Sequence, residues 1–344
     1  MAEFVLFLEC WKINKQVVIE RRTMMSRKPG GSRRKTDLSF EVISVHGISN
    51  RGKAKVTTVF PLRGKRNHND NPDNLPKALA ALNRQKLLED VNLVLFPAGF
   101  IRLDWIKDLH LERPKRSDQY DVKTVFPVLQ KFLNVNVRPL FKGERIGEIP
   151  NRILLGIDVK YSGTDTQLPG EAQLGILLDK NLRIHGATAK FYNPPAEERT
   201  QWNLISTSDY TTHFMSIPYL GEALVLYCFD LAALTARKKH ALKDKKAIGK
   251  INAADRTFKK RSPKLGLHLG HILEKPNTWK GKFTEVFVHK YGISNYISSS
   301  HLKLDEEKRF DKYRLYGGDI GVRVVIIKSV GGRGRVGPGQ VKTF

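Results

Sequence analysis

The stretch Val91-Asn92-Leu93-Val94-Leu95-Phe96-Pro97 constrains the fold more than any other part of the sequence. It is short and almost wholly apolar, and Pro97 and Gly99 end it. A strand of this kind is buried on both faces, which is typical of parallel strands covered by helices. Residues 75–91, directly before it, carry leucines at helical spacing. A helix that leads into a buried strand predicts a layered α/β fold.

Further strand patterns lie on both sides of this stretch. Alternating or continuous apolar runs predict strands at residues 38–45, 152–159, 172–178, 184–192, 223–229, 284–289, 296–300 and 322–327. Asp179-Lys180-Asn181 is typical of a hairpin turn between two of them. A helix is predicted at residues 125–132, and residues 231–250 form a very basic helical pattern. These segments fit one domain over residues 38–328, preceded by a basic flexible extension (1–37) and followed by a flexible Gly/Arg-rich tail (329–344).

The charge balance narrows the classes of partner. Lys and Arg outnumber Asp and Glu by 60 to 34, which gives a net charge of +26. Such a balance favours polyanions such as nucleic acid. The longest apolar stretch, residues 217–234, contains Glu222 and Asp230, so we expect no membrane partner. Cys10 and Cys228 are the only cysteines, which excludes a disulfide framework and favours a reducing, cytoplasmic location.

Three short segments carry the chemistry. The first is Val94-Leu95-Phe96-Pro97-Ala98-Gly99-Phe100; the second is Ala189-Lys190-Phe191-Tyr192-Asn193-Pro194-Pro195-Ala196-Glu197-Glu198; the third is Ala223-Leu224-Val225-Leu226-Tyr227-Cys228-Phe229-Asp230-Leu231. Their order and spacing resemble those of the nitrilase, or carbon–nitrogen hydrolase, superfamily. The resemblance covers roughly residues 38–327 and is weak after residue 231. It implies a two-sheet αββα sandwich, a homo-oligomer and no cofactor or metal.

The resemblance also implies a mechanism. Cys228 is the nucleophile, which attacks as a thiolate and forms a thioester. Lys190 stabilises the oxyanion, helped by the backbone N–H of Phe229. Glu197 or Glu198 matches a supporting glutamate. The substrate would be a small amide or nitrile.

Position 98 departs from the family pattern. The family places its general-base glutamate there, and this chain has Ala98, which has no proton acceptor. Loss of a general base costs about 10²–10⁴-fold in rate. We therefore expect a hydrolase that is nearly inactive as written, unless Asp104 or Glu89 replaces the base.

The basic surface offers a second hypothesis, a non-catalytic nitrilase-like protein that binds nucleic acid or a protein partner. A basic insertion near residues 237–264 holds twelve Lys or Arg against Asp244 and Asp255. The cations predicted to contact phosphates are Arg237, Lys238, Lys239, Lys245, Lys246, Lys259, Lys260 and Arg261. His268 and His271 have a spacing that could bind a metal, but Gly270 between them favours loop histidines.

Overall fold

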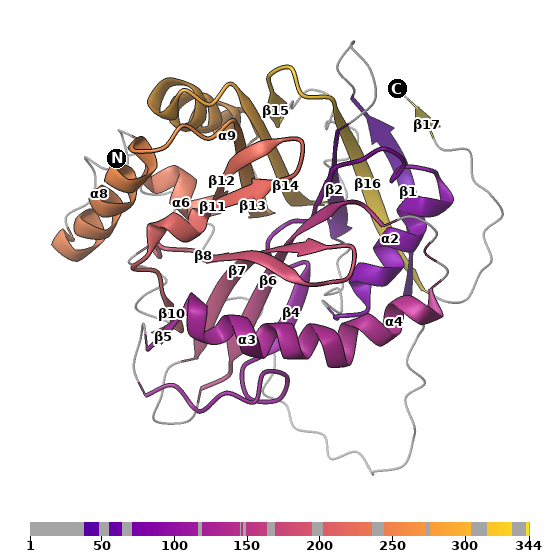
Figure 1. Ribbon diagram of the computed structural model, residues 1–344, viewed down its shortest axis with the longest axis horizontal. Coiled ribbons are helices and arrows are strands. Elements are labelled where there is room, and N and C mark those ends of the chain that lie inside the picture. The colour runs from indigo at the N-terminus through magenta and orange to yellow at the C-terminus, as the bar shows by residue number, and fades with distance from the viewer. Residues whose placement is uncertain are drawn as a thin grey trace, which may run out of the picture. The chain divides into compact units, whose positions relative to one another are not determined.

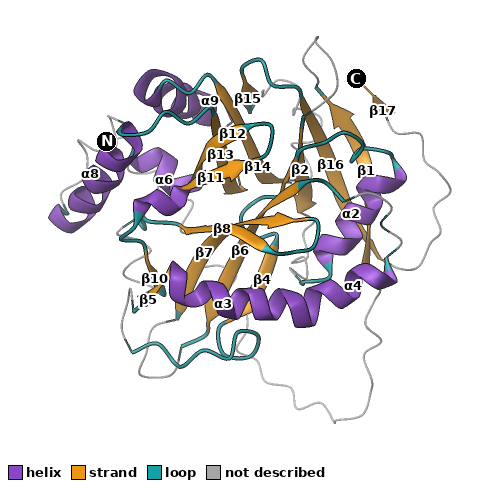
Figure 2. Cartoon of the chain, in the orientation of Figure 1, coloured by secondary structure: helices purple, strands orange, loops and turns teal. Residues whose placement is uncertain are grey.

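The computed structural model describes residues 38–47, 55–63, 71–115, 119–144, 146, 149–163, 169–194, 202–235, 244–272, 276–303, 315–331 and 342–343. Helices and strands alternate along the chain, and the strands form two stacked layers (Figures 1 and 2). The predicted α/β fold class is confirmed. Within the described residues, no helix is both long and apolar enough to span a membrane.

The first layer is a mixed sheet whose central strands are parallel. In spatial order it contains β1 (Leu38–His46), β16 (Val322–Gly331), β2 (Val56–Arg63), β3 (Leu93–Leu95), β6 (Arg152–Tyr161), β7 (Gly170–Asp179) and β8 (Ile184–Ala189). β16, β2, β3 and β6 run parallel, whereas β1, β7 and β8 are each antiparallel to a neighbour. β4 (Ile101–Asp104) pairs with β6 beyond the end of β3. β16 runs past residue 327, where the sequence pattern predicts that it ends.

The second layer contains β11 (Phe214–Ile217), β12 (Gly221–Tyr227), β13 (Leu265–Ile272), β14 (Asn295–Lys303) and β15 (Tyr316–Gly317). β12, β13 and β14 are parallel to one another. The first half of β14 pairs with β13, while Leu302 and Lys303 pair with Leu62 and Arg63 of β2. β14 therefore joins the two layers, and the chain folds the second layer over the inner face of the first.

Alternating side chains explain the layering. Along β3, Leu93 and Leu95 join the core that contains the second layer, whereas Val94 joins a separate core under α2 and α3. β6 alternates in the same way, with Leu154 in one core and Ile153 and Leu155 in the other. A strand with both faces buried needs apolar residues on both, which is why the 91–97 stretch is continuously apolar.

Helices cover both outer faces. On the first layer lie α2 (Asn74–Arg84), α3 (Val122–Phe132), a π-helical turn (Leu133–Val137) and α4 (Arg138–Gly143). On the second lie α6 (Cys228–Ala233), α8 (Lys245–Lys259), α9 (Pro276–Phe283) and a π-helical segment (Thr284–Lys290). The order helix, sheet, sheet, helix is the αββα sandwich that the sequence predicts. The remaining short elements are β5 (Tyr120–Asp121), β9 (Trp202–Asn203), β10 (Ile205–Ser206), a 3-10 turn (Tyr210–His213) and β17 (Lys342–Thr343).

Two sequence predictions in the second half are wrong. Residues 284–289 are helical rather than a strand, because Trp279, Phe283 and Phe287 recur every four residues and stack in sequence along one helical face. His268 and His271 lie on β13 rather than in a loop. The glycines in this strand are needed for close packing, since a Cβ on Gly266 would lie 2.6 Å from the Phe287 ring.

Candidate functional site

Each of the three segments lies at the end of a strand. Ala98 follows β3, Lys190 follows β8, and Cys228 follows β12 and begins α6. Cys228 is half-buried and forms no disulfide within the described residues. Lys190 is only 4% exposed and Ala98 only 1% exposed. A lysine buried to this extent is rare unless it has an electrostatic role, so Lys190 is distinguished from the surface lysines of this basic chain.

The second and third segments are in direct contact. The Lys190 ammonium lies 5.0 Å from the ring centroid of Phe229, the residue after Cys228. Asp230, one residue further, accepts hydrogen bonds from the backbone N–H groups of Phe191 (3.1 Å) and Tyr192 (2.9 Å). The turn that holds Cys228 is thereby joined to the residues after Lys190, although the two segments are 38 positions apart in sequence.

Asp230 is wholly buried, and its environment is unusual for a carboxylate. Burial raises the pKa of Asp230 to about 7, although the Tyr192 amide, Lys190 and the Phe191 amide each favour the charged form. Its Oδ1 accepts both amides, and its Oδ2 has no hydrogen-bond partner within the described residues. The Asp230 carboxyl thus titrates near neutral pH beside the turn that holds Cys228.

A polar row crosses the inner face of the first layer close to Lys190. In strand register, Arg102 is opposite Asp158, and Asp158 is opposite Gln173. Lys190 comes next, since its N–H donates to the Gln173 carbonyl (3.0 Å). Neighbouring strands lie about 4.8 Å apart, so the backbones of Asp158 and Lys190 are roughly 10 Å apart. The row therefore places one buried acid and one buried base at the same level between the two sheets.

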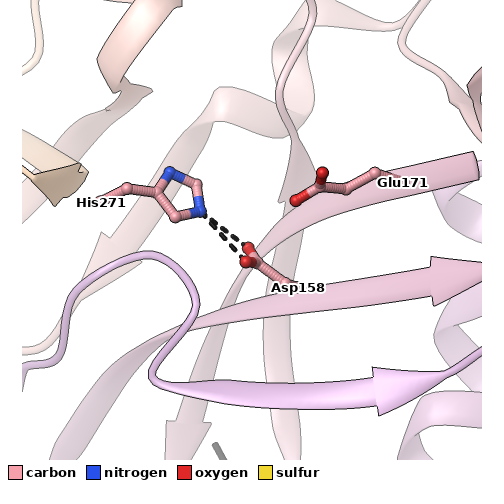
Figure 3. A group of neighbouring side chains, drawn as sticks. All are labelled: Asp158, Glu171 and His271. Carbon is pink, nitrogen blue, oxygen red and sulfur yellow. Dashed lines mark hydrogen bonds and ion pairs between the residues drawn. The ribbon is translucent and has the colours of Figure 1, made fainter. Parts of the chain in front are cut away.

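Asp158 pairs across the layers with His271, which the sequence analysis considered with His268 as a possible metal ligand and interpreted as a loop histidine. His271 Nε2 lies 2.9 Å from Oδ1 and 3.2 Å from Oδ2 of Asp158 (Figure 3). Burial alone would raise the pKa of Asp158, but His271, Lys160 and Arg102 together lower it below its usual range. Asp158 is therefore a buried carboxylate that stays ionised.

The same place holds a set of possible metal ligands. One ligand atom each from Asp158, Glu171 and His271 lies within 4.8 Å of the others (Figure 3). Carboxylate and imidazole groups are ligands for Zn²⁺ and related ions. Two cations already face these carboxylates: Arg102 lies 3.9 Å from Asp158, and Lys160 lies 3.7 Å from Glu171. The carboxylates are thus neutralised by the protein's own groups.

The backbone at Ala98 is fixed by contacts with β14 and β6. The Ala98 carbonyl accepts a hydrogen bond from His301 Nε2 (3.0 Å), which comes from β14 of the second layer. Gly156 packs against the turn so closely that a Cβ there would lie 2.5 Å from the Ala98 Cα. The two alternative bases have other surroundings. Asp104 accepts the N–H groups of its own turn at Ile106 (2.9 Å) and Lys107 (2.8 Å), and Glu89 is exposed on the loop after α2.

The other predicted residues divide between described and undescribed parts of the chain. Glu197, Glu198, Arg237, Lys238 and Lys239 lie outside the described residues. Lys245, Lys246, Lys259 and Lys260 are exposed at the two ends of α8. Arg261 is engaged within the protein, since it lies 2.7 Å from Glu222 and stacks on Phe214.

Comparison with solved structures finds the following similarities. An amidase from Nesterenkonia sp. has a TM-score of 0.38 and 14% identity, covering 74% of this chain and 79% of that chain. A variant of the Nesterenkonia AN1 amidase, described as a member of the nitrilase superfamily, has a TM-score of 0.38 and 15% identity over 74% and 79%. A glutamine-dependent NAD+ synthetase from Acinetobacter baumannii has a TM-score of 0.35 and 15% identity, covering 76% of this chain and 38% of that chain.

No family model matches the sequence. No curated protein matches it either. At these identities and TM-scores, the likeness to solved structures assigns neither an activity nor residue roles to this chain.

Proposed function

We propose that this protein is a nitrilase-like carbon–nitrogen hydrolase that uses Cys228 to attack a small amide or nitrile. The observation that carries the proposal is the contact between Lys190 and Phe229, which brings a buried ammonium to the residue after the thiol. A cation in that place stabilises both a thiolate and the oxyanion that forms when the thiolate attacks a carbonyl.

The chemistry follows in two halves. The thiol of Cys228 loses its proton and forms a C–S bond to the amide carbon, and the C–N bond breaks as the amine takes up a proton. Water then cleaves the thioester, releasing the acid and restoring the thiol. Lys190 and the N–H of Phe229 stabilise the negative oxygen in both halves. Ala98 has no proton acceptor, so no carboxylate at this position can take the proton from the Cys228 thiol. We therefore expect slow turnover.

The test is ammonia release from a panel of small amides and nitriles. We expect a slow release that disappears in Cys228→Ala. Ala98→Glu should raise the rate by about 10²–10⁴-fold, and Ala98→Glu combined with Cys228→Ala should remove the gain. A folded Ala98→Glu protein that stays inert over the whole panel would contradict the proposal, as would ammonia release that persists in Cys228→Ala.

One observation favours a second function, binding of nucleic acid. Four lysines at the ends of α8, Lys245, Lys246, Lys259 and Lys260, are exposed, although Lys259 also lies 3.6 Å from the Asp255 carboxylate. The opposite face of the helix is buried through Ile251 and Phe258. Changing these four lysines to Gln should weaken binding to a nucleic acid and flatten its dependence on salt, because each lost phosphate contact lowers the slope. Unchanged affinity and slope would leave α8 as a solvated surface.

A further inference from the structure

Tyr219 is the most exposed large apolar residue in the part of the chain that the structure describes. It lies in the turn between β11 and β12, where Ile217 pairs with Gly221, and it is 87% exposed. An aromatic ring usually gains a large free energy of burial when a protein folds. The ring of Tyr219 gains almost none, so packing within the fold does not account for an aromatic residue at this position.

The backbone of Tyr219 is strained as well. Its φ is +65°, in the left-handed region that glycine and asparagine adopt easily and that bulky residues rarely adopt. Strained residues gather at ligand-binding surfaces, where the strain holds a side chain in the place that the ligand needs. The turn thus holds an aromatic ring in solvent at a cost to stability.

Cations lie against the base of this hairpin. A Cβ on Gly221 would lie 3.4 Å from Lys264 Cδ, and the Lys264 N–H donates to the Glu222 carbonyl (2.9 Å). Arg261 lies 2.7 Å from the Glu222 carboxylate, and its guanidinium carbon is 4.8 Å from the ring centroid of Phe214 on β11. The loop that follows α8 is therefore packed onto the hairpin, and it brings its cations close to the turn that holds the exposed ring.

The ring and the neighbouring cations form one surface, which we call the basic hairpin surface. Its exposed residues are Tyr219, Lys259, Lys260, Arg261 and Lys264. Only two acids face it, Glu222 and Asp255, so the surface keeps a net positive charge. Cations next to an exposed ring fit single-stranded nucleic acid, because the cations contact phosphates and an unpaired base stacks on the ring. A duplex offers the same phosphates but keeps its bases inside the helix.

We propose that the basic hairpin surface binds single-stranded nucleic acid, with one unpaired base stacked on Tyr219 and a neighbouring phosphate at Lys264. The proposal rests on the second function proposed above, nucleic-acid binding by α8, and names the type of strand and the ring that selects it. Lys259 and Lys260 belong to both surfaces, so the two are continuous. Because every base has a π face, we expect selection for single strands rather than for a sequence.

The test compares two labelled probes by fluorescence anisotropy over a range of salt concentrations. One is a single strand of about 12 nucleotides, and the other is the duplex that it forms with its complement. Tyr219→Phe keeps the ring, whereas Tyr219→Asn removes it and suits the left-handed backbone. We expect Tyr219→Asn to weaken single-strand binding by roughly 5- to 150-fold, the loss of one base–aromatic stack. Tyr219→Phe should bind like wild type, and duplex binding should be equal in all three proteins.

Two further variants separate stacking from charge. Lys264→Gln should weaken the binding of both probes and reduce the slope of log K against log salt by about 0.7–0.9, because one phosphate contact is lost. Tyr219→Asn removes no charge and should leave that slope unchanged. Val135→Asn is the matched control, since it changes another exposed apolar residue (61%) on the π-helical turn after α3 and should alter neither affinity nor slope.

The outcomes separate this proposal from binding by α8. Single-strand affinity that is equal in wild type and Tyr219→Asn would overturn the stacking role, as would an equal loss of affinity for the duplex. If the variant with four α8 lysines changed to Gln still lost affinity, binding by α8 would stand without Tyr219. A loss in Tyr219→Asn, with unchanged binding in the four-lysine variant, would support stacking and contradict α8 as the binding element. A wild type that binds neither probe would contradict both proposals.

Discussion

Replacing Asp230 by Asn should change how the stability of the protein depends on pH. Burial raises the pKa of the Asp230 carboxyl from 3.8 to about 7. The folded state therefore binds this proton more tightly than the unfolded state. The resulting stabilisation is fully present below about pH 4 and is lost as the pH rises to about 7. The difference of roughly three pKa units corresponds to about 4 kcal/mol at 1.36 kcal/mol per unit.

Asn keeps an oxygen that can accept the N–H groups of Phe191 and Tyr192, and it does not titrate. Relative to wild type, Asp230→Asn should thus gain about 4 kcal/mol of unfolding free energy between pH 4 and pH 8, whatever its absolute stability. Urea unfolding followed by circular dichroism at the two pH values measures the difference. A gap between the two proteins that is the same at pH 4 and pH 8 would refute the argument that a desolvated carboxylate lies beside the Cys228 turn.

Asp158 gives the opposite sign and serves as the comparison. The pKa of its carboxyl is lowered in the folded protein, so its stabilisation is present above about pH 4 and is lost as the pH falls further. Asp158→Asn should therefore be less stable than wild type at neutral pH, and the gap should narrow in acid. If both Asn variants changed with pH in the same direction, the two carboxylates could not have the environments described.

Two further predictions concern packing and acid stability. Gly156→Ala would place a Cβ 2.3 Å from the Pro97 carbonyl oxygen and 2.5 Å from the Ala98 Cα, so we expect urea unfolding to show a loss of about 3 kcal/mol or more in unfolding free energy. Gly249→Ala is the control: a Cβ there has nothing within 4 Å, so the unfolding free energy should rise by about 1 kcal/mol. Equal effects of the two substitutions would contradict the packing described. Burial lowers the pKa of His213 from 6.5 to about 4 despite its bond to the Val225 carbonyl, so about 3 kcal/mol of stability should be lost as the pH falls through this window. His213→Gln should remove most of that loss, and an unchanged acid unfolding midpoint would refute the assignment.

Secondary structure was predictable from the sequence where the residues of a single segment are enough to determine its conformation. The runs at 91–97, 152–159 and 223–229 are apolar enough to specify buried strands without knowledge of their partners. Residues 284–289 were wrongly predicted as a strand because the apolar run Val286, Phe287 and Val288 is typical of a strand when it is considered alone. The helical repeat appears only when Trp279 and Phe283 are considered with them.

The candidate site residues could be proposed from the sequence only where they stand in a local motif. Cys228 and Lys190 stand in recognisable local motifs. The pair Asp158–His271 does not, because its members are 113 positions apart and meet only when the second layer covers the first. His268 and His271 suggested a loop, yet a strand prediction for residues 265–272 would have separated them onto opposite faces. That separation is observed: His268 lies against Phe283 of α9, and His271 faces Asp158.

The most direct test of the account is acylation of the thiol by an activated acyl donor. Wild type, Lys190→Met and Cys228→Ala would be mixed with p-nitrophenyl acetate at pH 7, quenched in acid and examined by peptide mass spectrometry. We predict one acetyl group on Cys228, formed much faster than on Cys10, slowed by about 10²-fold in Lys190→Met and absent from Cys228→Ala. Equal acetylation of Cys10 and Cys228, or a rate at Cys228 that does not depend on Lys190, would contradict a nucleophilic thiol beside a buried lysine.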